Sequence, residues 1–341
     1  MSETRCATLG TIGIEHGEEE LEIQNGSREL CYAQALISTH RSWCLSTPHV
    51  VTASTAFAAR HLVAPKVQHS HLWQQTAGQL TTPGELFGNS VPANSIPGGQ
   101  AEYVRCPLAD STFVLTPKNI PEEMLVLMAD IFPTGYFAAS RYLKNLNERD
   151  RKEFTVVCVG CGPVGICAIT AALTMVDKVY VVDSVPERLE EARKIGAIPI
   201  NLNDDPVAKI KAASDGRGAD VVMEVVGHAD AFHLAFDMIR PWGQISSIGV
   251  HTEPINMNGL MMYGKNVSMA FGRCPVRSIF EEALEVLVKE QKKVAFLCGK
   301  TMSLEDAPKA YEDFEQRKVT KVVFKMDKRE AGQDVAQKVK A

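Results

Sequence analysis

Acidic residues are missing from one long stretch of the chain. The 341-residue sequence holds 41 Asp and Glu residues, but none lies between Leu30 and Gly84, and no glycine lies between Leu30 and Ala77. Five of the nine histidines fall in this stretch, which shows neither the alternation of a strand nor the apolar stripe of a helix. Residues 30–84 therefore carry no predicted element, in contrast to the well-patterned sequence from residue 86 onward.

Long apolar runs and a basic excess are missing as well. No run of about 18 apolar residues occurs, which argues against a membrane span. The start, MSETRCATLG, lacks the basic segment and apolar stretch of a secretion signal, so we expect a cytoplasmic protein. The net charge of −5 offers no basic surface for a nucleic acid. We therefore expect a globular chain of two domains with neither nucleic acid nor membrane as a partner.

The nine cysteines are scattered and odd in number, which does not suggest a disulfide framework. Cys158 and Cys161 form a nominal CxxC motif, which in principle allows redox or metal chemistry. Cys158 lies within an apolar run, however, and Cys161 lies within a glycine-rich turn. We therefore interpret both as small buried residues rather than as a redox pair.

A glycine-rich turn gives the strongest signal in the sequence. The apolar, β-branched run 154–159 has the length of a strand and leads into a GxGxxG pattern at 160–165, after which 166–176 is typical of a helix. This strand–turn–helix context is the one that binds the pyrophosphate of a dinucleotide. The predicted binding residues are Gly160, Gly162, Pro163, Val164 and Gly165.

Each residue of this turn has a physical reason to be there. Gly160 permits the tight turn, Gly162 removes a side chain that would block the pyrophosphate, and Gly165 lets the helix pack closely on the strand. Pro163 suits the first helical turn, where its missing N–H group has no helical acceptor to lose. The unpaired N–H groups and the positive dipole end of the helix then favour an anion.

An acidic residue ends the next predicted strand. The run 178–182 leads to Asp183, which lies 23 residues after Gly160, close to the spacing expected for a carboxylate that binds the adenosine ribose. A carboxylate there repels a 2′-phosphate, so the sequence favours NAD over NADP. Arg188 is predicted to be a surface charge or a lid on the adenine, ahead of a role in binding a 2′-phosphate.

Strands and helices continue to alternate, which predicts parallel pairing with right-handed crossovers. The sequence therefore predicts an α/β fold with a Rossmann-type, doubly wound parallel sheet of six strands. Gly227 and the pair Gly249 and Val250 end two of the strands, so they are predicted to border the nicotinamide or, alternatively, to be turn residues only. The further predicted strands are 197–201, 220–226, 243–250 and 267–271, and the helices between them are 187–194, 206–213 and 228–239.

At this point the sequence resembles the zinc-type alcohol dehydrogenases of the medium-chain dehydrogenase/reductase superfamily. Within residues 86–326 the similarity is greatest to members of the glutathione-independent formaldehyde or secondary alcohol type. The segments that carry the resemblance are GGQAEYVRCPLADS (98–111), ADIFPTGY (129–136), VGCGPVGICA (159–168), VVDSVPERL (181–189), RPWGQISSIGV (240–250) and GRCPVRSIFEEALEVL (272–287).

The resemblance implies a domain organisation. A GroES-like, β-rich catalytic domain is expected from residues 1–127 plus 294–326, with an atypical N-terminal part that leaves it incomplete or degenerate. The NAD-binding domain is expected at 128–293, and residues 327–341 are expected to form a charged tail. Family members usually associate through the cofactor domain, so the resemblance implies a homodimer or homotetramer.

The resemblance also implies a chemistry. Members of the family move a hydride between NAD and an alcohol, aldehyde or ketone, typically with a catalytic zinc. Asp130 matches the third zinc-ligand position of the family and Thr134 a residue that packs against the nicotinamide. For Asp130, an N-cap for the following helix is an equally good interpretation.

The zinc ligands upstream of Asp130 are not recognisable, because the sequence has no Gly-His-Glu segment and no four-cysteine loop. Residues 30–84 are then a degenerate barrel, a site with rearranged ligands, or the product of a misread gene. The sequence therefore does not decide whether the protein binds zinc. Two other functions remain as alternatives: an NAD-binding pseudoenzyme and a zinc-independent quinone or enone reductase.

Overall fold

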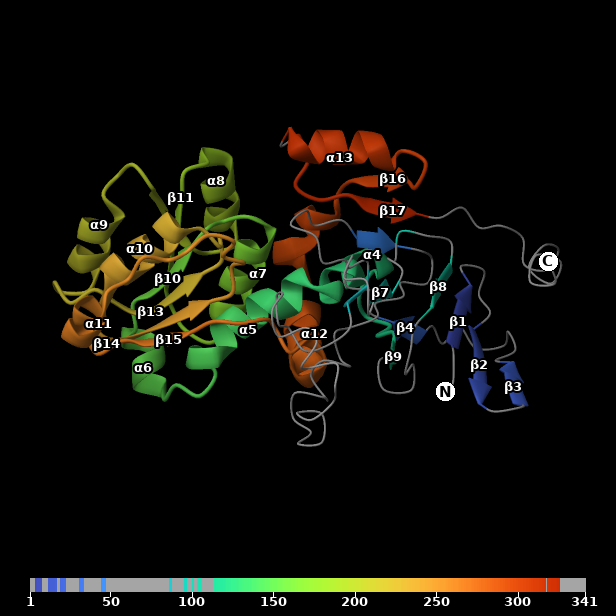
Figure 1. The fold of residues 1–341 in the computed structure, drawn as a ribbon, viewed down its shortest axis with the longest axis horizontal. Helices are drawn as coiled ribbons and strands as arrows, with labels where there is room; N and C mark the ends of the chain where they lie inside the picture. Colours follow the sequence, from blue (N-terminus) through green and yellow to red (C-terminus); the bar gives the residue numbers. More distant parts are fainter. Residues whose placement is uncertain are drawn as a thin grey trace. The chain divides into compact units, whose positions relative to one another are not determined.

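The structure is a computed structural model. It describes residues 114–316 and 318–325, together with Gln100 and the backbone of short strands before them (Figure 1). Most of residues 30–84, where the predicted zinc ligands would lie, and the predicted tail at 327–341 lie outside the described residues. In the part that the structure describes, no helix is both long and apolar enough to cross a membrane.

The chain divides into two units. Unit 1 comprises residues 1–130, 275–281 and 297–341, and unit 2 comprises residues 131–274 and 282–296. The long helix α12 (Val276–Val294) contributes to both units. We describe each unit by itself.

Unit 1 contains short strands in several small sheets. The sheet orders are β3-β2-β1-β8, β16-β17-β5, β4-β9 and β6-β7. The GroES-like barrel stays a prediction. The elements are β1 (Thr4–Ala7), β2 (Ile12–His16), β3 (Glu19–Glu22), β4 (Cys31–Ala33), β5 (Cys44–Ser46), β6 (Leu86–Phe87), β7 (Ser95–Ile96), β8 (Tyr103–Arg105), β9 (Phe113–Leu115), α4 (Glu122–Leu125), η2 (Val126–Ala129), β16 (Thr301–Ser303), α13 (Ala307–Glu315) and β17 (Val323–Lys325). The short helix η3 (Ala295–Cys298) contributes to both units.

Unit 2 is built on a parallel sheet of six strands in the order β12-β11-β10-β13-β14-β15. The order reverses between β10 and β13, so the sheet is doubly wound, as the alternating sequence predicts. This confirms the predicted α/β fold of the Rossmann type. The strands are β10 (Val156–Val159), β11 (Val179–Asp183), β12 (Ile198–Asn201), β13 (Ala219–Glu224), β14 (Ile239–Ser247) and β15 (Ser268–Ala270).

Helices cover this sheet and bury its apolar residues. On one face, Val157 and Val159 of β10 share a core with Phe232 and Phe236 of α10 and with Ile210 of α9. Alternation along β10 directs these two valines to the same face. The helices of unit 2 are α5 (Ile131–Leu143), α6 (Glu148–Glu153), α7 (Pro163–Ala172), α8 (Pro186–Lys194), α9 (Pro206–Ala213), α10 (Ala229–Met238) and α11 (Gly259–Lys265).

One boundary differs from the sequence prediction. The predicted helix 228–239 and the strand 243–250 leave a gap, whereas β14 begins at Ile239 directly after α10 and ends at Ser247. The register between β13 and β14 shifts near Ala219 and Val221, and Trp242 adopts a φ of 63°. Such an irregular strand start has no periodic signal, which is why the pattern of apolar residues places the start too late.

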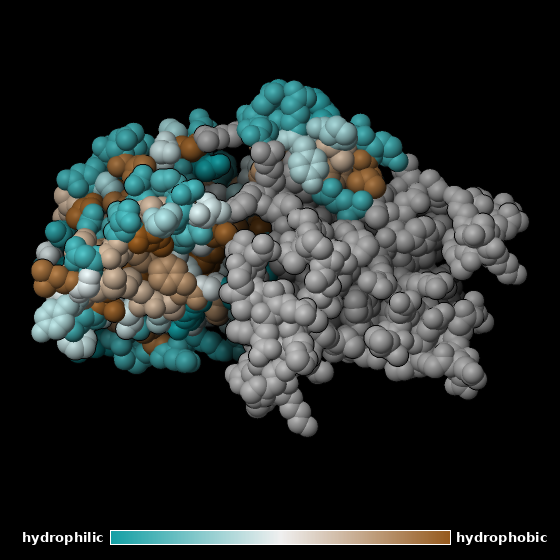
Figure 2. All heavy atoms as spheres, in the orientation of Figure 1, coloured by the Kyte–Doolittle hydropathy of each residue, from teal (hydrophilic) through white to brown (hydrophobic). Residues whose placement is uncertain are grey.

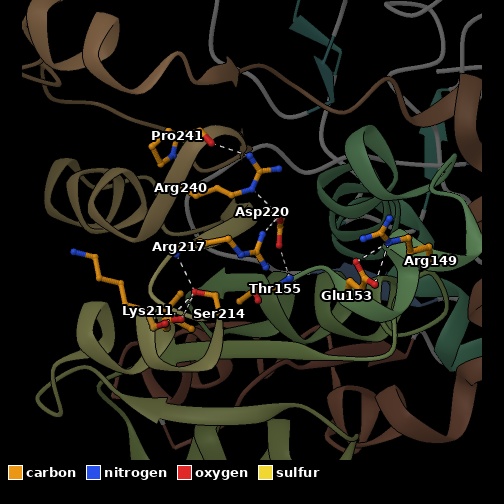
Figure 3. Close-up of polar contacts among 11 residues, drawn as sticks. Arg149, Glu153, Thr155, Lys211, Ser214, Arg217, Asp220, Arg240 and Pro241 are labelled. Carbon is orange, nitrogen blue, oxygen red and sulfur yellow. Dashed lines mark hydrogen bonds and ion pairs between the residues drawn. The ribbon is translucent and has the colours of Figure 1, made fainter.

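At the amino edge of the sheet, Asp220 of β13 fixes three segments. Its buried carboxylate accepts the N–H of Thr155 at 2.7 Å and pairs with Arg240 Nε at 2.6 Å, while Arg217 Nη1 lies 3.7 Å away (Figure 3). The close-up shows both arginine side chains directed toward this carboxylate. A buried charge with these partners ties the start of β10 to β13 and β14.

We predict that Asp220→Ala lowers the free energy of unfolding by about 2–3 kcal/mol, because the N–H of Thr155 and the guanidinium of Arg240 lose their acceptor. Urea denaturation of the full chain measures this. Arg217→Ala is the matched control, since the Arg217 side chain is 51% exposed, and we expect a loss below about 1 kcal/mol there. Equal losses in the two variants would contradict the prediction.

Candidate functional site

The turn between β10 and α7 brings two backbone segments very close together. A Cβ atom at Gly165 would lie 2.2 Å from the carbonyl oxygen of Gly160, so no side chain fits there. At Gly162, in contrast, nothing lies within 4 Å of the place a Cβ would take. The N–H of Gly160 donates to the carbonyl of Val182 at 2.9 Å, which joins the turn to β11. The turn is therefore closed at Gly165 and open at Gly162.

The amino end of α7 presents backbone donors at this open turn. Pro163 is the first helical residue and Gly162 is the N-cap, which has no side chain to cap the helix. The first bond of the helix runs from the N–H of Ile166 to the carbonyl of Gly162 at 2.9 Å. The N–H groups of Val164 and Gly165 consequently have no acceptor within the helix. Together with the helix dipole they form a site suited to an anion.

Asp183, the last residue of β11, is buried beside this turn. Its Oδ2 accepts the N–H of Cys161 at 2.7 Å and its Oδ1 accepts the N–H of Val185 at 2.9 Å. Arg188 Nη1 lies 3.9 Å from Oδ2, on a side chain that is 42% exposed. The structure thus places this acid next to the glycine turn, where its hydrogen bond to Cys161 helps to shape the turn. Each carboxylate oxygen still has acceptor capacity for a ligand hydroxyl.

The loops after β13 and β14 are in direct contact. A Cβ at Gly249 would lie 2.1 Å from the backbone nitrogen of Gly227, and Gly227 itself adopts a φ of 79° with its Cβ position 2.5 Å from the nitrogen of Val250. Both positions therefore require glycine. The side chains of Val226 and Val250 are mostly exposed at this edge. The structure brings the three predicted residues of these loops together at the carboxyl ends of their strands.

A buried polar cluster, which the sequence pattern did not predict, lies beneath these loops. Glu224, the last residue of β13, is fully buried, and its Oε1 accepts the N–H groups of Val226 and Gly227, both at 2.7 Å. Its Oε2 accepts the hydroxyl of Ser247 at 2.7 Å and lies 3.0 Å from His251 Nε2. An acid at the end of an apolar strand, three residues before a glycine, is a signal that could have indicated Glu224.

The two residues that the sequence suggests for catalysis lie near the start of α5. Asp130 directly precedes the first residue of this helix, and it is neither fully buried nor fully exposed. Thr134 lies in the first turn of α5 and is also partly buried. Their roles as zinc ligand, helix cap or nicotinamide contact stay predictions.

Comparison with known proteins shows which family the chain resembles. Residues 163–289 match the model of the zinc-binding dehydrogenases. The chain is 49% identical over 244 residues to zinc-type alcohol dehydrogenase B of Aspergillus flavus, which covers 70% of this chain and 56% of that protein. Over these residues the chain is similar to the zinc-type alcohol dehydrogenase family. This confirms the resemblance to the zinc-type alcohol dehydrogenases. The greater similarity to members of the formaldehyde or secondary alcohol type stays a prediction.

Other relatives support the same resemblance. A medium chain reductase/dehydrogenase, ucsI, of Acremonium sp. is 47% identical over 171 residues, which cover 49% of this chain and 57% of that protein. The chain thus spans little more than half the length of these two relatives. Among solved structures, the alcohol dehydrogenase of Thermus sp. ATN1 matches with a TM-score of 0.66 and 28% identity, over 77% of this chain and 76% of that one.

The name of the matched family implies a zinc ion, which needs a group of protein ligands close together. In the part of the chain that the structure describes, no three His, Cys, Asp or Glu side chains form a group that could hold a metal ion. Asp130 alone does not make a zinc site, because zinc takes at least three protein ligands. The described residues therefore do not fit the metal, and the further ligands expected upstream lie outside them.

The CxxC cysteines are buried thiols. Cys158 is fully buried in β10, and Cys161 Sγ lies 3.2 Å from the carbonyl oxygen of Arg188. Burial, and to a smaller extent the charge of Asp183, raises the pKa of the Cys161 thiol to about 12. Burial also raises the pKa of the Cys158 thiol well above its ordinary value. Neither thiol is a thiolate near neutral pH, which supports the interpretation of both as packing residues.

We predict that iodoacetamide at pH 8 modifies Cys161 about 1,000 times more slowly in the folded than in the unfolded chain, since the raised pKa leaves few thiolates. The rate should rise about tenfold per pH unit until the pKa is reached. Mass spectrometry of the Cys161 peptide measures the rate, with the chain in denaturant as control. Rapid labelling of the folded protein would show that the thiol is reactive after all.

Proposed function

We propose that this chain is an NAD-dependent oxidoreductase of the alcohol dehydrogenase type. The observation that carries the proposal is the pairing of an open, donor-lined turn at Gly162 with a buried carboxylate, Asp183, at the end of the neighbouring strand. An anion and a sugar hydroxyl held side by side are what an adenine dinucleotide presents. The family resemblance supports the same cofactor.

The pyrophosphate would be held by the turn and the amino end of α7. The absence of a side chain at Gly162 lets phosphate oxygens reach the N–H groups of Val164 and Gly165, and Gly160 and Pro163 set the backbone for this approach. Charge–dipole attraction and hydrogen bonding act in the same direction here. This part of the site contacts only the pyrophosphate, so it gives affinity rather than selectivity between NAD and NADP.

Asp183 would give the selectivity. Its oxygens are fixed by the N–H groups of Cys161 and Val185, so the carboxylate faces the ribose without losing entropy on binding. A 2′-phosphate would be repelled by this charge, which favours NAD over NADP. Arg188 lies too far from Oδ2 for a short ion pair and only partly offsets the charge.

The nicotinamide half would lie over the second half of the sheet. The loops with Gly227, Gly249 and Val250 end β13 and β14, beyond the point where the strand order reverses. Thr134 in α5 is the proposed contact to the ring. The apolar side chains exposed in these loops would shield the ring from water, which strengthens electrostatic interactions around it.

The chemistry that NAD supplies when bound is hydride transfer between its nicotinamide ring and an alcohol or carbonyl carbon. This chain's described residues bind and orient the cofactor for that step. A small alcohol, aldehyde or ketone is the proposed substrate class, in line with the relatives' names. Asp130 is the proposed protein ligand if zinc is present, and the described residues do not complete a group of three ligands with it.

We extend the proposal to self-association through unit 2. The last strand of the sheet, β15, pairs only with β14 among the described residues. Large apolar side chains nearby are exposed: Leu260 at 78%, Tyr263 at 79% and Phe271 at 50%. The coloured surface in Figure 2 shows hydrophobic patches among hydrophilic ones. A homodimer or homotetramer would cover such residues.

We predict that the chain binds NADH more tightly than NADPH and that Asp183→Asn lowers NADH affinity about tenfold, because a charge-assisted acceptor is lost. The ratio of NADH affinity to NADPH affinity should also fall in the same variant. Fluorescence titration measures both ligands. Arg188→Ala is the control, and its half-exposed side chain should change NADH affinity by less than about threefold. A wild-type preference for NADPH would refute the assignment of Asp183.

Turnover tests the function itself. We expect the full-length chain to reduce NAD in the presence of a primary or secondary alcohol, followed by NADH absorbance, with about one zinc per chain by elemental analysis if the metal is used. Saturable NAD binding without turnover would indicate the NAD-binding pseudoenzyme instead. Metal-free reduction of quinones or enones with NADPH would indicate the reductase. Absence of any dinucleotide binding would end the proposal.

A further inference from the structure

The cluster under the nicotinamide loops is built around one carboxylate. Glu224 accepts four hydrogen bonds or close polar contacts through its side chain: two from the backbone of the loop after β13, and one each from Ser247 and His251. Its own backbone carbonyl also accepts the N–H of Ile248 at 3.0 Å, in the loop after β14. One residue therefore holds both loops.

Serine, histidine and glutamate are also the residues of a hydrolytic triad, but this geometry does not allow that chemistry. Ser247 Oγ lies 3.1 Å from His251 Nε2, and Glu224 Oε2 lies 3.0 Å from the same nitrogen. A triad needs the acid on the other ring nitrogen, and His251 Nδ1 is buried without a hydrogen-bond partner among the residues that the structure describes. Ser247 is moreover 1% exposed, so its hydroxyl is not available to a substrate.

The loops that Glu224 holds have no freedom to shift independently. Gly227 and Gly249 are in backbone contact, and a Cβ at Gly160 in the phosphate-side turn would lie 2.7 Å from the side chain of Val226. Aromatic contacts support the other end of the cluster, since the His251 ring lies edge-on to Phe232 with ring centroids 5.9 Å apart. The loop after β13 thus fills the space between the glycine turn and the loop after β14.

We infer that Glu224 is a positioning residue that sets the shape of the nicotinamide end of the cofactor site by fixing the loops after β13 and β14. The inference rests on the proposed function, because it assumes that NAD binds at this edge of the sheet. Glu224 acts through the loop backbone and does not itself touch the cofactor. Its loss should therefore weaken the half of the dinucleotide that lies over these loops more than the adenosine half.

A comparison of ADP-ribose with NADH isolates the contribution of the nicotinamide end of the site. ADP-ribose keeps the adenosine, the pyrophosphate and a ribose but lacks the nicotinamide. In Glu224→Ala we expect NADH affinity to fall about tenfold more than ADP-ribose affinity, because four partners lose their acceptor and the loops move. Isothermal titration of the full chain with each compound gives the ratio of NADH affinity to ADP-ribose affinity. A ratio equal to that of the wild type would overturn the inference.

Glu224→Gln is the conservative variant that should restore the ratio to within about twofold of the wild type. The amide oxygen can accept the N–H groups of Val226 and Gly227, while the amide NH₂ faces Ser247 Oγ and His251 Nε2, both of which can accept a hydrogen bond. A Gln variant as impaired as the Ala variant would show that the charge, not the positioning of the loops, is what matters.

Asp220→Ala is the matched control, because it removes a second buried carboxylate from the same strand, β13. Asp220 (Figure 3) lies near the start of this strand, whereas Glu224 is its last residue. It should lower stability while leaving the NADH to ADP-ribose ratio unchanged. A changed ratio there would mean that any destabilisation of β13 has this effect. If Glu224→Ala does not fold, Ser247→Ala provides the test, with an expected fall in the ratio of about threefold, and an unchanged ratio would again overturn the inference.

The outcomes for the wild type distinguish this inference from the proposed function. A wild-type chain that binds neither NADH nor ADP-ribose refutes the proposed function, and the inference falls with it. A wild-type chain that binds both, with a Glu224→Ala variant that loses both equally, leaves the proposed function standing and refutes only the positioning role.

Discussion

At the carboxyl edge of the six-stranded sheet, buried carboxylates accept backbone N–H groups from the loops that follow the strands. Asp183 ends β11 and accepts the N–H of Val185, two residues on, and Glu224 ends β13 and accepts the N–H of Val226, also two residues on. Burying a charge is unfavourable unless hydrogen bonds offset the lost hydration, and both acids meet that condition. The shape of the proposed cofactor site depends on this repeated arrangement.

The two acids occupy different places in the sheet. Asp183 ends β11, one strand away from the point where the strand order reverses, whereas Glu224 ends β13, which lies at that point. In the first half of the sheet the acid joins the glycine turn through Cys161, and in the second half it joins two loops through Gly227 and Ser247. One half thus prepares a site for a phosphate and a sugar, while the other shapes a surface with exposed valines. The opposite edge of the sheet carries Asp220, whose partners are Arg217, Arg240 and the N–H of Thr155 just before β10.

Much of this fold could be predicted from local pattern. The six parallel strands and the helices between them follow from alternating apolar runs, and the glycine turn follows from its place between a strand and a helix. The start of β14 could not be predicted, because Ile239 follows α10 without a turn signal. Glu224 was missed because a single acid at a strand end shows its role only when the loops that it holds are folded beside it.

The sequence by itself determined the α/β architecture, the glycine turn and the acid beside it, since these depend on residues that are close along the chain and on periods of two and 3.6 residues. Only the tertiary structure decided that Gly227 and Gly249 touch, that Ser247 and His251 converge on Glu224, and that burial raises the pKa of the Cys161 thiol. The reason is that these contacts join segments far apart in the chain, and burial and hydrogen bonding between them exist only once the sheet has formed.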